Sequence, residues 1–166
     1  MIVRNEAPSD IDAITGVTRA AFENHPISQG TEQFITAALR EAGALTLSLV
    51  AEIDGQAVGH VALSPVAISD GSPYWYGLGP ISVLPARQRQ GVGKALMREA
   101  LSRLRSRGAA GCVLVGDPAY YEQFGFRSFP ELTHEGVPQQ FVLALPFGEH
   151  VPHGAVIFHE AFKATG

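Results

Sequence analysis

Hydrophobic and polar residues repeat with two different periods in the N-terminal half of the chain. Ile2-Val3-Arg4 predicts a short strand, and the next apolar stripe predicts a helix that is capped by Ser9 or Asp10 and runs to about Asn24. A second helix follows Thr31 and ends at Gly43, and its spacing predicts a buried stripe of Phe34, Ile35, Ala38 and Leu39. Two strands, over residues 45–53 and 56–68, are joined by Asp54-Gly55, a strong signal for a two-residue hairpin turn.

The C-terminal half alternates strands with helices. Residues 74–83 predict a strand, but Gly77, Gly79 and Pro80 interrupt it, so a bulge or a splayed pairing is expected there. The clearest helix runs from Gly91 to about Arg107, with Val92, Leu96 and Leu104 on its apolar face. The remaining elements are a buried strand over 111–115, a short helix over 118–124, and strands near 126–129, 141–145 and 156–158. The pattern predicts a mixed α/β architecture of the α+β type.

Composition narrows the class of protein. The length of 166 residues is typical of one domain, and we expect a single domain over 1–166. The content of 46% hydrophobic and 17% charged residues favours a folded core, and the net charge of -4 argues against nucleic acid as a partner. Cys112 is the single cysteine and lies in an apolar run, which predicts a buried thiol. Arg4, Asn5 and Glu6 are unlike a secretory signal, and no apolar run approaches the ~20 residues of a membrane span, so a soluble cytoplasmic protein is expected.

The segment Gln88-Arg89-Gln90-Gly91-Val92-Gly93-Lys94 lies between a predicted strand and the best predicted helix. Helix N-termini bind phosphate through free N–H groups and the helix dipole, and glycines let the ligand approach the backbone. Arg87, Arg89 and Lys94 flank the glycines and indicate a local anion site in an acidic protein. The segment lacks the first glycine and the Ser or Thr of a Walker A loop, and Leu96 replaces the third glycine of a Rossmann fingerprint.

The remaining spacing, with Gln88, Gly91 and Gly93, resembles the acetyl-coenzyme A loop of the GCN5-related N-acetyltransferase (GNAT) superfamily. Two more segments resemble that family: Ile81-Ser82-Val83-Leu84-Pro85, like its strand 4, and Tyr121-Glu122-Gln123-Phe124-Gly125-Phe126, like its Tyr-x-x-x-Gly-Phe element. Within the superfamily, residues 116–126 most resemble the YhbS-like acetyltransferases. The resemblance implies one mixed, mostly antiparallel sheet of six to seven strands with four helices and a splayed pair of strands 4 and 5.

The resemblance also implies where the donor binds. Backbone N–H groups of Gln88 to Gly93 would hold the pyrophosphate, and Arg87, Arg89 and Lys94 would neutralise phosphate charge. Main-chain groups freed by the broken strand could pair with the pantetheine amides and polarise the thioester carbonyl. The expected cofactor-binding residues are Ile81, Ser82, Val83, Gln88, Arg89, Gln90, Gly91, Val92, Gly93, Lys94 and Phe124.

The residues that transfer protons are a candidate general acid and two candidate general bases. Tyr121 is the candidate general acid for the thiolate, since the family's tyrosine occupies this position, and packing against the sheet is its alternative. Glu52 and His60 are candidate bases, directly or through water, with a strand role as the alternative for each. Asp117 precedes Pro118 and is expected to cap the short helix. Trp75 with its tyrosine neighbours could line an acceptor pocket, or pack in the core or against a second copy of the chain in a dimer. No metal site is expected.

The expected function is transfer of an acetyl group from acetyl-coenzyme A to a primary amine, by direct attack and without an acyl-enzyme. The alternatives are a coenzyme A-binding module without turnover and a toxin-like acetyltransferase acting on aminoacyl-tRNA, which the acidic charge disfavours. The sequence leaves open a small-molecule or protein acceptor and a monomer or homodimer. The acceptor depends on loops such as Asn24 to Gly30 that carry no motif.

Overall fold

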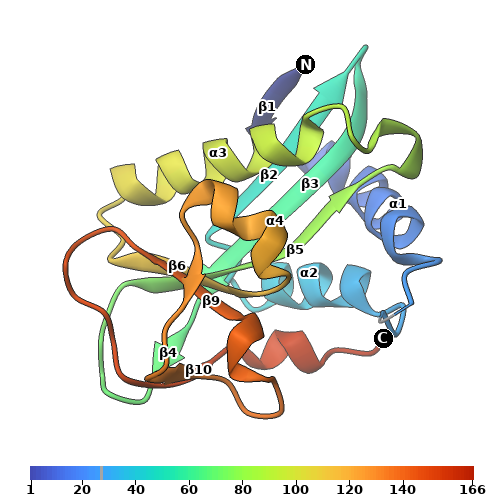
Figure 1. Ribbon diagram of the computed structural model, residues 1–166. Coiled ribbons are helices and arrows are strands. Elements are labelled where there is room, and N and C mark those ends of the chain that lie inside the picture. Colours follow the sequence, from blue (N-terminus) through green and yellow to red (C-terminus); the bar gives the residue numbers. More distant parts are fainter. Residues whose placement is uncertain (27) are drawn as a thin grey trace. The chain divides into compact units, whose positions relative to one another are not determined.

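The computed structural model describes residues 1–26 and 28–166 (Figure 1); Ile27, within the stretch expected to shape the acceptor site, lies outside them. The chain divides into two compact units, each built from segments far apart in sequence. The first unit comprises Met1–Ser64, Gly79–Ala100 and Glu160–Gly166, and the second comprises Pro65–Leu78 and Leu101–His159.

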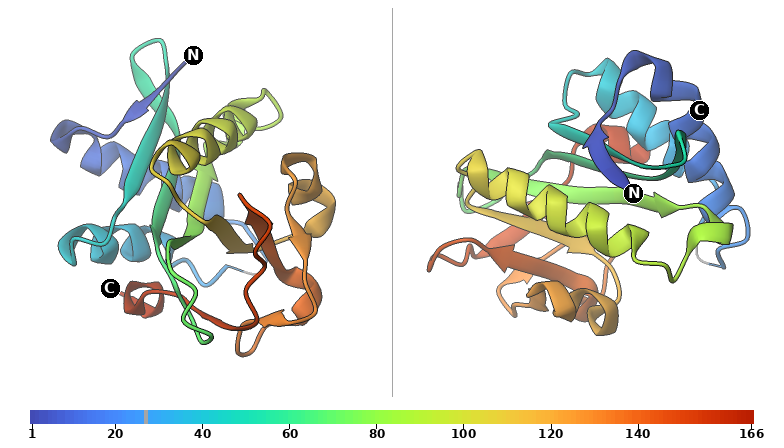
Figure 2. Two further views of the ribbon diagram at one scale, coloured as in Figure 1. Left: turned by 90° about the vertical axis from the view of Figure 1, so that its left-hand side faces the viewer. Right: turned by 90° about the horizontal axis from the view of Figure 1, so that it is seen from above.

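The first unit holds a hairpin and helices on both of its faces. Its elements are β1 (Ile2–Asn5), α1 (Ile11–Phe22), α2 (Glu32–Glu41), β2 (Leu47–Ile53), β3 (Gln56–Pro65), the end of β5 (Trp75–Val83) and the start of α3 (Val92–Ser106). Asp54 and Gly55 turn the hairpin with φ angles of 51° and 76°, as a type I′ turn requires, so the predicted hairpin is confirmed. Figure 2 shows α3 on one face of β2 and β3, and α1 and α2 on the other.

The second unit contains a small sheet as well as part of the large one. Its elements are β4 (Ala67–Ile68), the start of β5, the end of α3, β6 (Gly111–Val115), α4 (Pro118–Tyr121), β7 (Arg127–Ser128), β8 (Leu132–Thr133), β9 (Val142–Pro146) and β10 (Gly154–Ile157). Its core includes Trp75, Phe129 and Leu132. Trp75 is 1% exposed, and its ring covers Gly111, so it packs in the core.

Hydrogen bonds order the strands of the described residues as β1-β2-β3-β5-β6-β9-β7 in one sheet and β4-β10-β8 in the small one. In the large sheet β5 and β6 run parallel, whereas the pairs of β1 with β2, β2 with β3, and β9 with β6 and β7 are antiparallel. The predicted mixed, mostly antiparallel sheet with four helices is therefore confirmed. The prediction of a single sheet omitted the small one, whose strands are two to four residues long.

Three local predictions need correction. The strand predicted to reach residue 68 ends at Pro65, and β4 pairs instead with β10. On α2 the buried residues are Gln33, Thr36 and Leu39, whereas Phe34 and Ile35 are only half-buried. This helix contacts both α1 and the C-terminal turn at Glu160–Lys163, so its apolar residues are shared between two contacts instead of facing one core. Asp10 stands at the N-cap of α1 but makes no capping bond, because its carboxylate accepts from Arg4 and the Ala7 N–H.

Candidate active site

The glycine-bearing loop joins β5 to the N-terminus of α3. After a turn at Pro85–Arg87, the chain turns through Gln88 to Gly91, and α3 begins at Val92. Arg89 and Gly91 have left-handed φ angles of 64° and 85°. Residues of alternating backbone handedness point successive N–H groups towards one side, which makes a concave site for an anion.

Two glutamine side chains brace this loop from within. Gln88 Nε2 donates to the Val83 carbonyl at 3.2 Å, and Gln90 Nε2 donates to the Ala86 carbonyl at 3.1 Å. The side chain of Gln88, one of the expected cofactor-binding residues, is thus turned back onto β5. The main-chain N–H groups at the start of α3 have no acceptor within their own helix, so they can serve an anion.

A close contact beneath α3 fixes where the loop lies. Gly59 on β3 faces the helix so closely that an added Cβ would lie 2.9 Å from Val92 Cγ1 and 3.0 Å from Leu96 Cδ1. Only glycine allows the first turn of α3 to approach the strand at this distance. Gly59 is absent from the predicted site residues, although a glycine inside a predicted strand is itself a signal of close backbone approach.

The end of β5 directs part of its main chain away from β3. The Leu84 N–H donates to the Val58 carbonyl at 2.9 Å, which joins the end of β5 to the start of β3 in an antiparallel pair. Because alternate residues of an antiparallel strand bond to opposite sides, the amide groups of Val83 and Ile81 point away from β3. The ladder of β5 with β6 covers only Trp75–Gly77 with Gly111–Val113 in the described residues, as expected for a splayed pair.

Tyr121 lies on the last turn of α4 in the second unit. Asp117 Oδ1 accepts the Ala119 N–H at 2.9 Å, so the predicted cap is confirmed. The Tyr121 ring rests on Gly116 and meets the Tyr120 ring edge-on, with centroids 4.9 Å apart. Burial, with smaller contributions from Tyr120 and Asp117, raises the pKa of Tyr121 to about 12. The hydroxyl therefore stays protonated at neutral pH and can donate a proton.

Phe124 lies in the 3-10 turn that follows α4 (Glu122–Phe124). Its ring packs against Tyr120 with centroids 5.7 Å apart. Tyr120 is 39% exposed, which distinguishes it from the more deeply buried Tyr121. The two neighbouring hydroxyls thus lie in different environments on one turn of helix.

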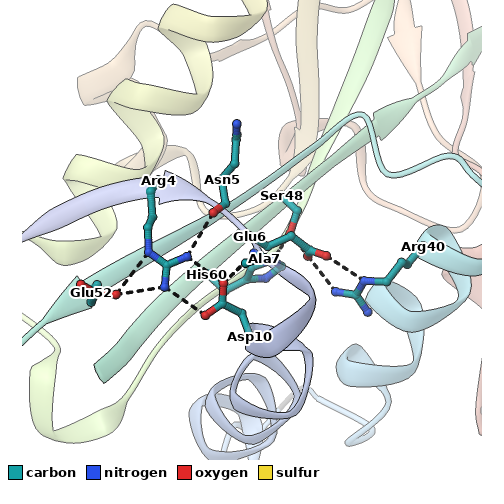
Figure 3. A network of polar contacts seen from close by, with 9 residues as sticks. All are labelled: Arg4, Asn5, Glu6, Ala7, Asp10, Arg40, Ser48, Glu52 and His60. Atoms are coloured by element: carbon teal, nitrogen blue, oxygen red, sulfur yellow. Dashed lines mark hydrogen bonds and ion pairs between the residues drawn. The ribbon is translucent and has the colours of Figure 1, made fainter. Parts of the chain in front are cut away.

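The two candidate bases occupy different parts of one polar network in the first unit (Figure 3). Glu52 Oε1 accepts from Arg4 at 3.0 and 3.2 Å, and Arg4 also bonds to Asp10, so the Glu52 carboxylate is held in an ion-pair cluster. His60 is completely buried, and its Nε2 lies 2.7 Å from Ser48 Oγ. His60 therefore has no direct access to a substrate in solution.

The fold and the loop together define a class of acyl-coenzyme A-dependent transferase, and comparison with known proteins supports this. Residues 45–128 match the model of the acetyltransferase (GNAT) domain. The N-acetyltransferase YhbS of Escherichia coli strain K12 is 39% identical over 127 residues, which cover 76% of this chain and 73% of YhbS.

Two solved structures resemble nearly the whole chain. A GNAT family acetyltransferase from Brucella melitensis, in complex with acetyl-CoA, is 49% identical with a TM-score of 0.87 over 97% of both chains. YhbS from Escherichia coli, in complex with CoA, is 32% identical with a TM-score of 0.90 over 99% of this chain and 93% of that one. The chain belongs to the GNAT family and is an acetyl-CoA-dependent acyltransferase.

The described residues contain no cluster of three or more His, Cys, Asp or Glu side chains placed to hold a metal ion. None of the described helices has the length and apolar character of a membrane span. Cys112 is fully buried, and burial raises the pKa of its thiol far above the ordinary range, so it is not a nucleophile at neutral pH.

Proposed function

We propose that the chain transfers the acetyl group of acetyl-CoA to a primary amine by direct attack, with Tyr121 as general acid. The observation that carries this proposal is the loop from Gln88 to Gly93, which offers main-chain N–H groups at a helix N-terminus beside exposed Arg89 and Lys94. These groups suit the pyrophosphate of the donor. The half-buried Phe124 is proposed to pack on the pantetheine arm.

The end of β5 would hold the thioester. Main-chain groups of Ile81 and Val83 point away from β3 and would bond the pantetheine amides, while Ser82 turns its side chain inward. One of these N–H groups would stabilise the oxyanion that forms on the carbonyl. The Val83 carbonyl accepts from Gln88, so donor binding would exchange this bond for one to the ligand.

The reaction balances with residues of the chain. The amine nitrogen bonds to the carbonyl carbon, the carbon–sulfur bond breaks, and the thiolate takes the proton of the Tyr121 hydroxyl. The amine loses one proton, and Tyr121 regains one from solvent. The raised pKa of Tyr121, about 12, keeps this proton in place until the thiolate forms.

Thiol release from acetyl-CoA, measured with a thiol-trapping reagent, tests this function. Aminoalkanes, polyamines, amino acids and peptides would be offered as acceptors. Tyr121→Phe is expected to lower kcat by about 10²-fold while coenzyme A still raises the melting temperature. Tyr120→Phe is the matched control, since Tyr120 is exposed and adjacent, and it should retain the wild-type rate.

A second function, coenzyme A binding without turnover, is favoured by one observation. Glu52 is paired with Arg4 and His60 is fully buried, so neither candidate base is both unpaired and exposed. If no amine yields free thiol while coenzyme A still raises the melting temperature, the binding module replaces the enzyme. An unchanged rate in Tyr121→Phe would instead remove only the role of Tyr121.

A further inference from the structure

A chain of polar side chains in the first unit leads from the partly exposed Arg40 to the buried His60 (Figure 3). Arg40 on α2 donates to both oxygens of Glu6 at 2.8 and 2.9 Å. Glu6 also contacts the hydroxyl of Ser48 on β2, and Ser48 Oγ lies 2.7 Å from His60 Nε2 on β3. These elements come from distant parts of the sequence, and the network ends at a fully buried imidazole.

Counting protons fixes the state of His60. Burial alone would raise the pKa of Glu6, but hydrogen bonds from Arg40 and Ser48 outweigh it and lower the pKa, so Glu6 is ionised and only accepts. Ser48 has one hydroxyl proton, which must therefore go to Glu6. Ser48 Oγ then accepts from His60, so His60 carries its proton on Nε2 and a free lone pair on Nδ1.

His60 Nδ1 is buried without a hydrogen-bond partner in the described residues, and so is Ser82 Oγ. Ser82 lies two residues before Leu84 on β5, and His60 lies two residues after Val58 on β3, so the two residues lie near one another on neighbouring strands. A water molecule between them would donate to Nδ1 and accept from the serine hydroxyl, which would satisfy both groups. Ser82 lies on the strand that would hold the thioester.

We propose that Ser82 and His60 hold this water, and that His60 receives through it the proton that the amine loses. The proposal rests on the proposed function. The proton enters at Nδ1, the Nε2 proton passes to Ser48, and the Ser48 proton passes to Glu6. After the product leaves, Nδ1 gives its proton to water that enters the site, and a solvent proton returns through Glu6 and Ser48 to Nε2, which restores the starting tautomer. The Glu6 side chain is 18% exposed, so it can release the proton to solvent. His60, Ser48 and Glu6 are positioning and relay residues, because none touches the substrate.

The charges around His60 agree with this role. Burial lowers the pKa of His60 to about 4, with Glu6 acting to raise it and Arg40 to lower it, so the imidazole is neutral at pH 7. An alkylammonium has a pKa of roughly 10.4, far above that of His60. The amine therefore arrives at the site as the free base. The relay takes the proton that the amine nitrogen releases after it has bonded to the thioester carbonyl carbon.

The relay is tested by measuring kcat and KM of the wild type and its variants, with an amine that the wild type is found to acetylate as acceptor. His60→Gln keeps a donor for Ser48 but has no basic lone pair, and it should lower kcat by about 10²-fold with the KM for acetyl-CoA unchanged. Ser48→Ala should lower kcat by about tenfold. Ser64→Ala is the control, because Ser64 is also buried on β3 and has no hydrogen-bond partner among the described residues, but lies outside the relay.

Nitrogen-15 NMR of His60 supplies a readout that a purely structural role would not change. The wild type should show a protonated Nε2 and an unprotonated Nδ1 at pH 7, and Ser48→Ala should lose this preference. A protonated Nδ1 in the wild type, or an unchanged kcat in His60→Gln, would overturn the relay and leave the proposed function standing. Absence of turnover by the wild type with every amine would overturn both.

Discussion

His60 should make the protein lose stability on mild acidification, and replacing it should remove that loss. The ordinary histidine pKa is 6.5, and burial lowers the pKa of His60 to about 4. Between these values the unfolded chain binds one proton more than the folded one, so the free energy of unfolding falls as the pH falls. This loss of stability is absent above pH 6.5 and complete below pH 4.

The size of this loss in the free energy of unfolding follows from the two pKa values of His60, unfolded and folded. The slope in that window is about 1.4 kcal/mol per pH unit, and a difference of about 2.5 units gives about 3 kcal/mol. This is a large share of the ~5–15 kcal/mol that stabilises a typical domain. The His60→Gln variant has no group that titrates at this position, so its free energy of unfolding should depend much less on pH between pH 6.5 and pH 4.

Urea denaturation at several pH values from 7 to 4 measures this difference directly. The wild type should lose about 3 kcal/mol more than His60→Gln over this range, and Ser64→Ala, which retains His60, should follow the wild type. Equal slopes for wild type and His60→Gln would refute the reasoning. Such a result would mean that the folded protein accommodates an imidazolium at His60 and that burial does not lower the pKa of this residue.

Three further substitutions test other parts of the molecule. Gly116→Ala would place a methyl group against the Tyr121 ring and should lower kcat at least tenfold in the thiol-release assay, with coenzyme A binding retained. Gly59→Ala should push α3 away from β3, which should lower stability to urea by about 1–3 kcal/mol and weaken coenzyme A binding in a titration. Asp10→Asn should lower stability by about 1–2 kcal/mol at pH 7, allowing for the partly exposed Arg4. Hydrogen bonds from Arg4 and Ala7 lower the pKa of Asp10 from 3.8 to about 2, so this difference is present above pH 3.8 and vanishes as the pH falls through 2.

Features set by neighbouring residues could be predicted from the sequence. Asp54 and Gly55 determine the hairpin turn because both adopt left-handed φ angles. The helix α3 follows from the spacing of its own apolar residues and ends before Gly108, whose φ is 80°. Asp117 caps the short helix as expected, because the capping bond reaches only to Ala119. Each of these depends on interactions within a few positions along the chain.

Features set by distant residues could not be predicted in this way. The stripe on α2 was assigned from its spacing alone, yet the C-terminal turn more than a hundred residues away helps decide which side is buried. Glu6 and Ser48 are 42 positions apart, and Glu6 and Arg40 are 34 apart. Neither pairing has a local signal, so the sequence offered His60 as a base without showing that it is buried and bonded.

Donor binding and proton removal therefore differ in how far apart in the sequence their residues lie. The proposed donor site is a local motif, because a strand end, a turn and a helix start supply main-chain N–H groups whatever their side chains are. In the proposed relay, proton removal needs a lone pair held in one tautomer, and two strands, one helix and the segment after β1 must meet to hold it. A relative could keep the loop and lose this pathway through one change at Ser48 or Glu6. Such a chain would still bind coenzyme A, which is why binding alone cannot distinguish an enzyme from a binding module in this family.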